Sequence, residues 1–180
     1  MDKPSRQGLS QVSIRTRPGC RSLGILTAGG RNMPVVLGRA GILANKREGD
    51  GGTPRGVFRP RRLWWRADRM PRPATRLPAV RISRDVAWCE DPADRRYNRP
   101  FRRDRAATGD RLWRQDRLYD LIIEIDHNTL PRVKGRGSAV FIHVARPDRS
   151  PTAGCVAMTH AQLSWLLSRL SERTRISIQF

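Results

Sequence analysis

Helical periodicity occurs at only one place in this sequence, and it comes near the end. The segment THAQLSWLLSRLSERTR (159–175) carries leucines at i, i+3, i+4 and i+7 from Leu163, which is the spacing of an apolar helix face. Thr159 and Gln162 precede these leucines in the positions of a capping box. The sequence therefore predicts one amphipathic helix, late in the chain, and leaves the rest of the fold to strands.

Short runs rich in β-branched residues, interrupted by Gly and Pro, fill the first third of the chain. Four of them predict strands of an antiparallel meander: QVSIRT (11–16), SLGILTA (22–28), MPVVLG (33–38) and GILA (41–44). After the helix, RISIQF (175–180) alternates apolar and polar residues, which predicts a closing strand.

Two nearly continuous apolar runs, RLYDLIIEID (117–126) and SAVFIHVA (138–145), are joined by a Gly-containing loop over 127–137. Such runs predict strands that are buried on both faces, at the centre of a sheet. The element order shows neither βαβ alternation nor an internal repeat. We therefore expect a mostly β fold of packed or partly closed sheets, with one late amphipathic helix and a closing C-terminal strand.

The length of 180 residues suits a single domain over 1–180. Residues 66–116 are rich in Arg and poor in apolar runs, so the sequence pattern does not indicate what function this region has. Within them, the segment 92–110 is expected to run over the surface, as long loops do. The glycines of 38–52 match neither G-x-G-x-x-G nor a P-loop, which disfavours a doubly wound nucleotide-binding fold.

The formal charge of +20 favours anionic partners such as nucleic acid, acidic lipid headgroups or an anionic cell-wall polymer. Of the 36 basic residues, only Lys3, Lys46 and Lys134 are lysines, so 33 are arginines, a skew that a GC-rich genome also produces. The basic residues are spread along the chain, and no nucleic-acid-binding motif accompanies them, so we do not favour nucleic acid. The sequence shows neither a signal-peptide core nor a membrane span, and as given it is expected to be soluble and unexported.

The three cysteines, Cys20, Cys89 and Cys155, are an odd number without C-x-x-C spacing. This count indicates neither a disulfide framework nor a zinc ribbon, so no metal site is expected. Pairing of Cys20 with Cys89 in an oxidising compartment stays open, and inert half-buried thiols are the alternative.

The segment AVFIHVARPDRSPTAGCVAM (139–158) brings two reactive side chains close together in the sequence. A cysteine attacks a carbonyl as thiolate, so it needs a base within hydrogen-bond reach and donors for the developing oxyanion. His143 is the candidate base for Cys155, and Gly154 permits the unusual backbone that a nucleophile turn requires. Thr152 either orders this loop through side-chain hydrogen bonds to the backbone or holds the other ring nitrogen of His143.

These residues make the chain resemble the L,D-transpeptidase catalytic domain family, which has the YkuD-like fold. In that family a strand ends in I-H and is followed by [ST]-x-G-C, an amphipathic helix and a final strand, and here Ile142–His143 and Thr152–Cys155 match in that order. A T-P-x-G-x-F turn ahead of the catalytic region is matched at residues 53–58. The similarity is greatest to a smaller, divergent proteobacterial branch.

The chain also departs from the family pattern [S/T]-H-G-C-x-R. Ala153 stands where a histidine is common, and Ala157 where an arginine is common. The interval between His143 and Cys155 is shorter than in typical members. The loss of the motif arginine leaves recognition of the substrate carboxylate to another residue, and Arg146 and Arg149 are candidates together with Thr152.

The resemblance implies an acyl-transfer enzyme of cell-wall biogenesis and a carbapenem target. Cys155, activated by His143, attacks the carbonyl after the third residue of a peptidoglycan stem peptide, and the amine of a second stem resolves the thioester. Backbone N–H groups near Gly154 stabilise the oxyanion, and a backbone carbonyl of the same loop orients His143. No cofactor is required.

The expected partners are donor and acceptor peptidoglycan stems, the expected state is a monomer, and the implied location is the periplasm or cell envelope. Two alternatives stay open. One is a Cys-His amidase or carboxypeptidase on a related acyl substrate. The other is a non-catalytic, Arg-rich protein that binds nucleic acid or a wall polymer.

Overall fold

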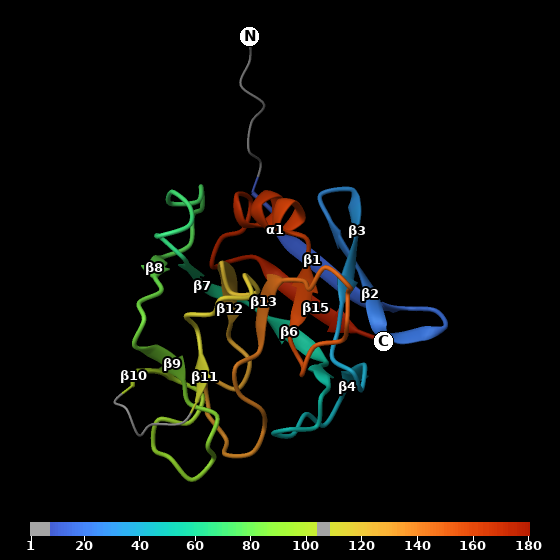
Figure 1. The fold of residues 1–180 in the computed structure, drawn as a ribbon. Helices are drawn as coiled ribbons and strands as arrows, with labels where there is room; N and C mark the ends of the chain where they lie inside the picture. The colour runs from blue at the N-terminus through green and yellow to red at the C-terminus, as the bar shows by residue number, and fades with distance from the viewer. Residues whose placement is uncertain (1–7, 104–108) are drawn as a thin grey trace.

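The computed structural model describes residues 8–103 and 109–180, and its strands dominate the fold (Figure 1). In chain order the elements are β1 (Gln11–Arg17), β2 (Cys20–Ala28), β3 (Arg31–Val36), β4 (Ile42–Leu43), β5 (Thr53–Pro54), β6 (Gly56–Phe58), β7 (Pro60–Trp65), β8 (Ala79–Arg81), β9 (Val86–Trp88), β10 (Pro100–Arg102), β11 (Asp110–Arg111), β12 (Leu121–Ile125), β13 (Phe141–Val144), β14 (Val156–Met158), α1 (His160–Leu167) and β15 (Arg175–Gln179). The expected mostly β fold with one late helix and a closing strand is confirmed.

Ten strands form one mixed sheet in the order β6-β15-β1-β2-β3-β14-β13-β12-β7-β8. The predicted antiparallel meander is present as β1, β2 and β3. The prediction that 41–44 continues this meander was wrong, because β4 instead pairs in parallel with β5 in a separate two-stranded sheet. The edge of β3 that β4 would have used is occupied by β14, through the pairing of Ala157 with Val36.

The two apolar runs form β12 and β13, which are neighbours in the middle of the large sheet. Alternate residues of β12 face two different cores, as the period of a strand requires. Leu121, Ile123 and Ile125 face a core that includes α1, whereas Ile122 faces a second core that includes Cys155. Burial on both faces explains why these strands are nearly continuously apolar.

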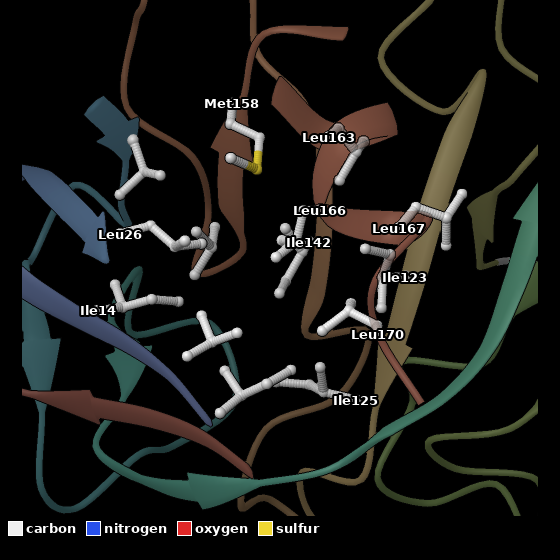
Figure 2. Packing of buried hydrophobic residues seen from close by; sticks show 14 of the residues in the cluster. Ile14, Leu26, Ile123, Ile125, Ile142, Met158, Leu163, Leu166, Leu167 and Leu170 are labelled. Carbon is white, nitrogen blue, oxygen red and sulfur yellow. The ribbon is translucent and has the colours of Figure 1, made fainter. Parts of the chain in front are cut away.

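The helix α1 covers the first core. Leu163, Leu166 and Leu167 point from α1 toward Ile142 and Ile123 of the sheet (Figure 2). The predicted capping box is present, because Thr159 accepts from the N–H of Gln162 and the Gln162 side chain accepts from the N–H of Thr159.

The helix is shorter than the periodic segment 159–175. It ends at Leu167, and Ser168 caps it. Beyond it, the N–H of Ser171 donates to the Thr174 side chain, and Thr174 in turn donates to the carbonyl of Leu9. These side-chain hydrogen bonds compete with further helical turns. Leu170 remains fully buried in the core although it lies outside the helix.

A three-stranded sheet, β10-β9-β11, lies on the side of β12 away from the meander (Figure 1). Within the segment 92–110, β10 pairs with β9, and Tyr97 and Asn98 are buried. The part of that segment from 104 to 108 lies outside the described residues. Trp88 of β9 packs edge-on against Phe141 of β13, with ring centroids 4.9 Å apart, so the small sheet closes over the second core.

Candidate active site

Cys155 and His143 come from two neighbouring parallel strands. Strands β13 and β14 pair with Ile142 opposite Val156 and His143 opposite Ala157, and Cys155 stands immediately before β14. Side chains two residues apart on a strand project from the same face of a sheet. Cys155 and His143 therefore lie on the same face, as diagonal neighbours, although 12 positions separate them in the sequence.

Both side chains line one cleft, which has a volume of about 260 Å³. The wall opposite them comes from segments distant in the sequence. The lining residues are Glu90, Asp110, Arg114, Leu118, Tyr119, His143, Arg146, Ser150, Pro151, Thr152, Ala153, Cys155 and Ala157. Ala153 and Ala157, the two departures from the family pattern, both line this cleft.

The thiol of Cys155 is held by the backbone. Its S–H donates to the carbonyl of Ala139 at 3.1 Å, and its sulfur accepts from the N–H of Phe141 at 3.4 Å. The residue is buried, and this burial raises the pKa of the thiol to about 12, with the negative charges of Asp110 and Glu90 acting in the same direction. The resting side chain of Cys155 is therefore a protonated thiol.

The ring of His143 is fixed in orientation. Its Nδ1 lies 2.9 Å from the carbonyl of Val144, which requires the proton on Nδ1 and leaves Nε2 unprotonated. The ring also packs edge-on against Tyr119, with centroids 5.3 Å apart. Burial lowers the pKa of His143 to about 4, so the imidazole is neutral at physiological pH and able to accept a proton.

The turn before Cys155 is organised by Thr152. Its hydroxyl donates to the carbonyl of Cys155 at 2.6 Å and accepts from the N–H of Gly154 at 3.1 Å. Of the two roles weighed for Thr152, the structure shows this ordering of the loop. The N–H of Gly154 is therefore engaged within the turn. Among the described residues, the N–H of Cys155 has no hydrogen-bond partner and is the remaining donor at the nucleophile.

Gly154 is required by its surroundings as well as by its conformation. Its φ of +148° is a value that L side chains rarely adopt, and a Cβ at this position would lie 2.8 Å from the carbonyl oxygen of Gly52. Gly38 is more crowded still, because a Cβ there would lie 2.2 Å from the carbonyl oxygen of Gly51. The nucleophile turn therefore sits directly against the backbone of the 49–52 turn.

The second family motif, at 53–58, adjoins the first. Thr53 is fully buried, and its hydroxyl accepts from the N–H of Gly38 at 2.9 Å. Gly38 in turn forms a β-bridge with Thr152. This chain of contacts places the T-P-x-G-x-F segment behind the nucleophile turn, where it supports the backbone of the site.

Sequence reasoning missed the acidic wall of the cleft. Asp110 accepts a hydrogen bond from the hydroxyl of Tyr119 at 2.7 Å and lies 3.6 Å from the guanidinium of Arg114. Partial loss of hydration at the wall of the cleft, aided by the negative charges of Asp110 and Glu48, raises the pKa of Glu90 to about 7, although the residue keeps an exposed surface. Glu90 and Asp110 come from segments without periodicity, so only the pairing of β9 with β11 reveals that they meet.

Only one of the two candidate arginines lines the cleft. Arg146 lines it with Cys155, whereas Arg149 does not; both arginines line a neighbouring hollow beside β14, and Arg149 also borders a hollow formed by residues of β2 and β3. Arg114 also lines the cleft, although the sequence analysis did not single it out. Its guanidinium makes a bidentate pair with Asp116 through Nε and Nη2, at 2.5 Å for the shorter contact.

The remaining features considered from the sequence are the cysteines, metal binding and membrane spans. Cys20, Cys89 and Cys155 are all free thiols. Among the described residues, no group of three or more acidic, His or Cys side chains is arranged to hold a metal ion. Nor does any helix in 8–103 or 109–180 have the length and hydropathy needed to cross a membrane.

Comparison with known proteins agrees with the motifs. No curated protein matches the chain. Among solved structures, the crystal structure of L,D-transpeptidase 1 from Mycobacterium tuberculosis aligns with a TM-score of 0.39 and 13% sequence identity. The alignment covers 93% of this chain and 61% of that one, so the chain spans about three fifths of the length of that protein. The family model of the L,D-transpeptidase catalytic domain (YkuD) matches residues 21–178, and the chain therefore belongs to this family.

Proposed function

We propose that the protein is a cysteine-dependent L,D-transpeptidase that acts on peptidoglycan stem peptides in the cell envelope. The observation that carries this proposal is the shared cleft of Cys155 and His143, in which Nδ1 of His143 faces the Val144 carbonyl. This arrangement leaves Nε2 available as the base for the thiol. Membership of the family supports the substrate class.

In the first half of the reaction, Nε2 of His143 takes the S–H proton while Sγ of Cys155 attacks the carbonyl carbon after the third stem residue. The N–H of Cys155 donates to the oxyanion that forms. The tetrahedral intermediate then collapses, the C–N bond to the terminal D-alanine breaks, and the proton on His143 passes to the leaving amine. The product is a thioester on Cys155.

In the second half, the amine of another stem attacks the thioester carbonyl, and His143 takes one of its protons. The C–S bond breaks, and the proton returns to the Cys155 sulfur. Water in place of the amine releases a shortened stem, which is the carboxypeptidase outcome. The solvent-facing positions of Ala153 and Arg146 leave the cleft open for either acceptor.

For the stem carboxylate we propose Arg146. It lines the cleft and is exposed, whereas Arg114 is paired with Asp116 and Arg149 does not line the cleft. Arg146 thus takes the place of the motif arginine that is missing at Ala157. An Arg146→Ala variant is expected to raise KM for stem peptides with little change in kcat, while Arg149→Ala leaves both near the wild-type values.

The proposal is tested by intact-mass analysis after exposure to a carbapenem, whose β-lactam carbonyl stands in for the stem carbonyl. Wild type is expected to gain one adduct per chain. Cys155→Ala should form none, and His143→Ala should form it about 100-fold more slowly, since a positioned base contributes at least that much. Cys89→Ala, which removes a buried thiol outside the cleft, is the matched control. Folded wild type that forms no adduct, or an adduct that persists in Cys155→Ala, would contradict the proposal.

A further inference from the structure

Lys46 is an unusual residue in this chain. Lysine is rare here, at three of 36 basic residues, and arginine serves as the cation almost everywhere else. Yet Lys46 is buried, with 7% of its surface exposed, whereas Lys134 is exposed. A buried charge is costly unless it is paired, and the partner of Lys46 is Asp50.

The side chain of Lys46 lies directly behind the nucleophile turn. A Cβ placed on Gly154 would be 3.7 Å from Cε of Lys46, and one placed on Gly137 would be 2.9 Å from its Cγ. The lysine stem therefore passes against the backbone of both glycines. These glycines flank the site on two sides, because Gly154 precedes Cys155 and Gly137 precedes the strand that carries His143.

The ammonium of Lys46 is held in one place. It donates to the carbonyl of Arg47 at 2.6 Å and to Oδ1 of Asp50 at 2.5 Å. Asp50 is itself fixed, because its carboxylate also accepts from the N–H groups of Arg47 and Gly52. A charge held by a turn in this way does not have to reorganise when negative charge appears nearby.

We infer that Lys46 is an electrostatic positioning residue of the nucleophile: its fixed positive charge, buried behind Gly154, stabilises the negative charge that develops on Cys155 as the thiol loses its proton. The role in catalysis rests on the proposed function. The effect on the thiol itself does not, since it can be measured without any stem peptide.

The other charged and titratable groups around Cys155 explain why such a charge is needed. Asp110 and Glu90, from the acidic wall, raise the pKa of the Cys155 thiol, whereas Lys46 lowers it. The neutral groups on the same face are His143 and Tyr119, and burial raises the pKa of the Tyr119 hydroxyl well above its ordinary value. Lys46 therefore opposes the acidic wall at the sulfur from behind the turn, whereas Arg114 and Arg146 line the cleft itself.

The test is the rate at which iodoacetamide, a small neutral reagent, alkylates Cys155, followed by peptide mass analysis so that Cys20 and Cys89 are counted separately. Three substitutions separate charge from hydrogen bonding and from packing. Lys46→Met keeps the apolar stem, Lys46→Gln keeps an N–H donor without the charge, and Lys46→Arg keeps the charge. Lys134→Met removes an exposed lysine and is the matched control.

At a fixed pH near 8, the Met and Gln variants are expected to react roughly tenfold more slowly than wild type, which corresponds to a thiolate disfavoured by about one pKa unit. The Arg variant and the Lys134→Met control should react within about twofold of wild type. If the Met variant does not fold, the contrast between Gln and Arg still decides the question. Lys46→Gln reacting as fast as wild type, or Arg reacting as slowly as Gln, would overturn the inference.

These outcomes are distinct from a failure of the proposed function. A wild-type protein that forms no carbapenem adduct contradicts the transpeptidase assignment, but the alkylation rates still report the charge effect on the thiol. Where the adduct does form, the rate of acylation should rise in the order Lys46→Met, Lys46→Gln, Lys46→Arg, wild type. KM for the carbapenem should be unchanged.

Discussion

The S–H of Cys155 donates to the carbonyl of Ala139 at 3.1 Å, so the thiol proton of the resting site is bonded to the backbone of the segment that leads into β13. In the reaction proposed above, attack on a substrate requires this hydrogen bond to break and the proton to pass to His143. The resting pair is neutral, because burial disfavours both the thiolate and the imidazolium. The following predictions depend on that arrangement.

The pH dependence of acylation should reflect a neutral pair. With the pKa of His143 lowered to about 4 and that of Cys155 raised to about 12, the reactive form persists between these values. The rate of carbapenem acylation is therefore expected to be flat around neutrality and to fall only as the pH drops toward about 4, where His143 becomes protonated and can no longer accept a proton. Single-turnover rates from pH 4 to 9, with circular dichroism as a check on folding, measure this. An acid limb with a midpoint above 6 would indicate an ion pair instead.

Gly154→Ala is expected to damage both fold and activity. The added methyl would lie 2.8 Å from the carbonyl oxygen of Gly52, at a backbone φ of +148°. We expect a loss of about 2 kcal/mol in the free energy of unfolding and a failure to acylate, because the turn that positions Cys155 must move. Gly49→Ala is the control, since Gly49 also has a positive φ but open space around it. Equal losses in the two variants would show that strain alone, without the contact to Gly52, accounts for the effect.

Thr152→Val should remove the side-chain hydrogen bonds that order the turn before Cys155, while the shape of the side chain stays the same. Valine loses both hydrogen bonds of the hydroxyl, to the carbonyl of Cys155 and from the N–H of Gly154. The expected cost is roughly 1–3 kcal/mol of stability, together with slower acylation, as these backbone groups lose their partner. Denaturant unfolding and adduct formation measure the two effects. Thr152→Ser keeps the hydroxyl and should retain most of both; a Ser variant as impaired as Val would argue for packing of the methyl group.

Glu90→Gln should make Cys155 more reactive toward iodoacetamide. The carboxylate of Glu90 raises the pKa of the Cys155 thiol, so removal of its charge favours the thiolate. Alkylation is expected to be about two- to threefold faster, because a solvent-screened charge at the edge of a cleft changes the free energy of the thiolate by only a small amount. This change has the opposite sign to that of Lys46→Met. The same assay measures it, with Glu172→Gln, outside the cleft, as the control. Slower alkylation of Glu90→Gln would assign Glu90 a structural role.

Much of the framework was predictable because it depends on local patterns. The continuous apolar runs placed β12 and β13 at the centre of the sheet, and the capping box placed the start of α1 at the correct residue. The segment from His143 to Cys155 was recognisable because strand, turn and nucleophile follow one another along the chain. In each of these cases the residues that decide the structure are neighbours in the sequence.

The features that were not predicted depend on pairing between distant segments. Strand β4 left the meander because β14 occupies the edge of β3, a competition that no local pattern expresses. Glu90, two residues beyond β9, meets Asp110 of β11 only because β9 and β11 pair, and Lys46 reaches the site only because its turn packs behind Gly154. Arg146 lines the cleft and Arg149 does not, although the two belong to one turn and share a neighbouring hollow.

The position of β15 has a consequence for the synthesis of the protein. This last strand lies between β1 and β6, and Ile176 and Ile178 are fully buried against residues from the start of the chain. While the ribosome still holds the final residues, β1 and β6 have no common neighbour, and both present unpaired backbone groups. The nascent chain is therefore expected to complete its sheet only once β15 has been synthesised and has left the exit tunnel, and a product that stops before Arg175 would expose open edges on β1 and β6 of the kind that promotes aggregation.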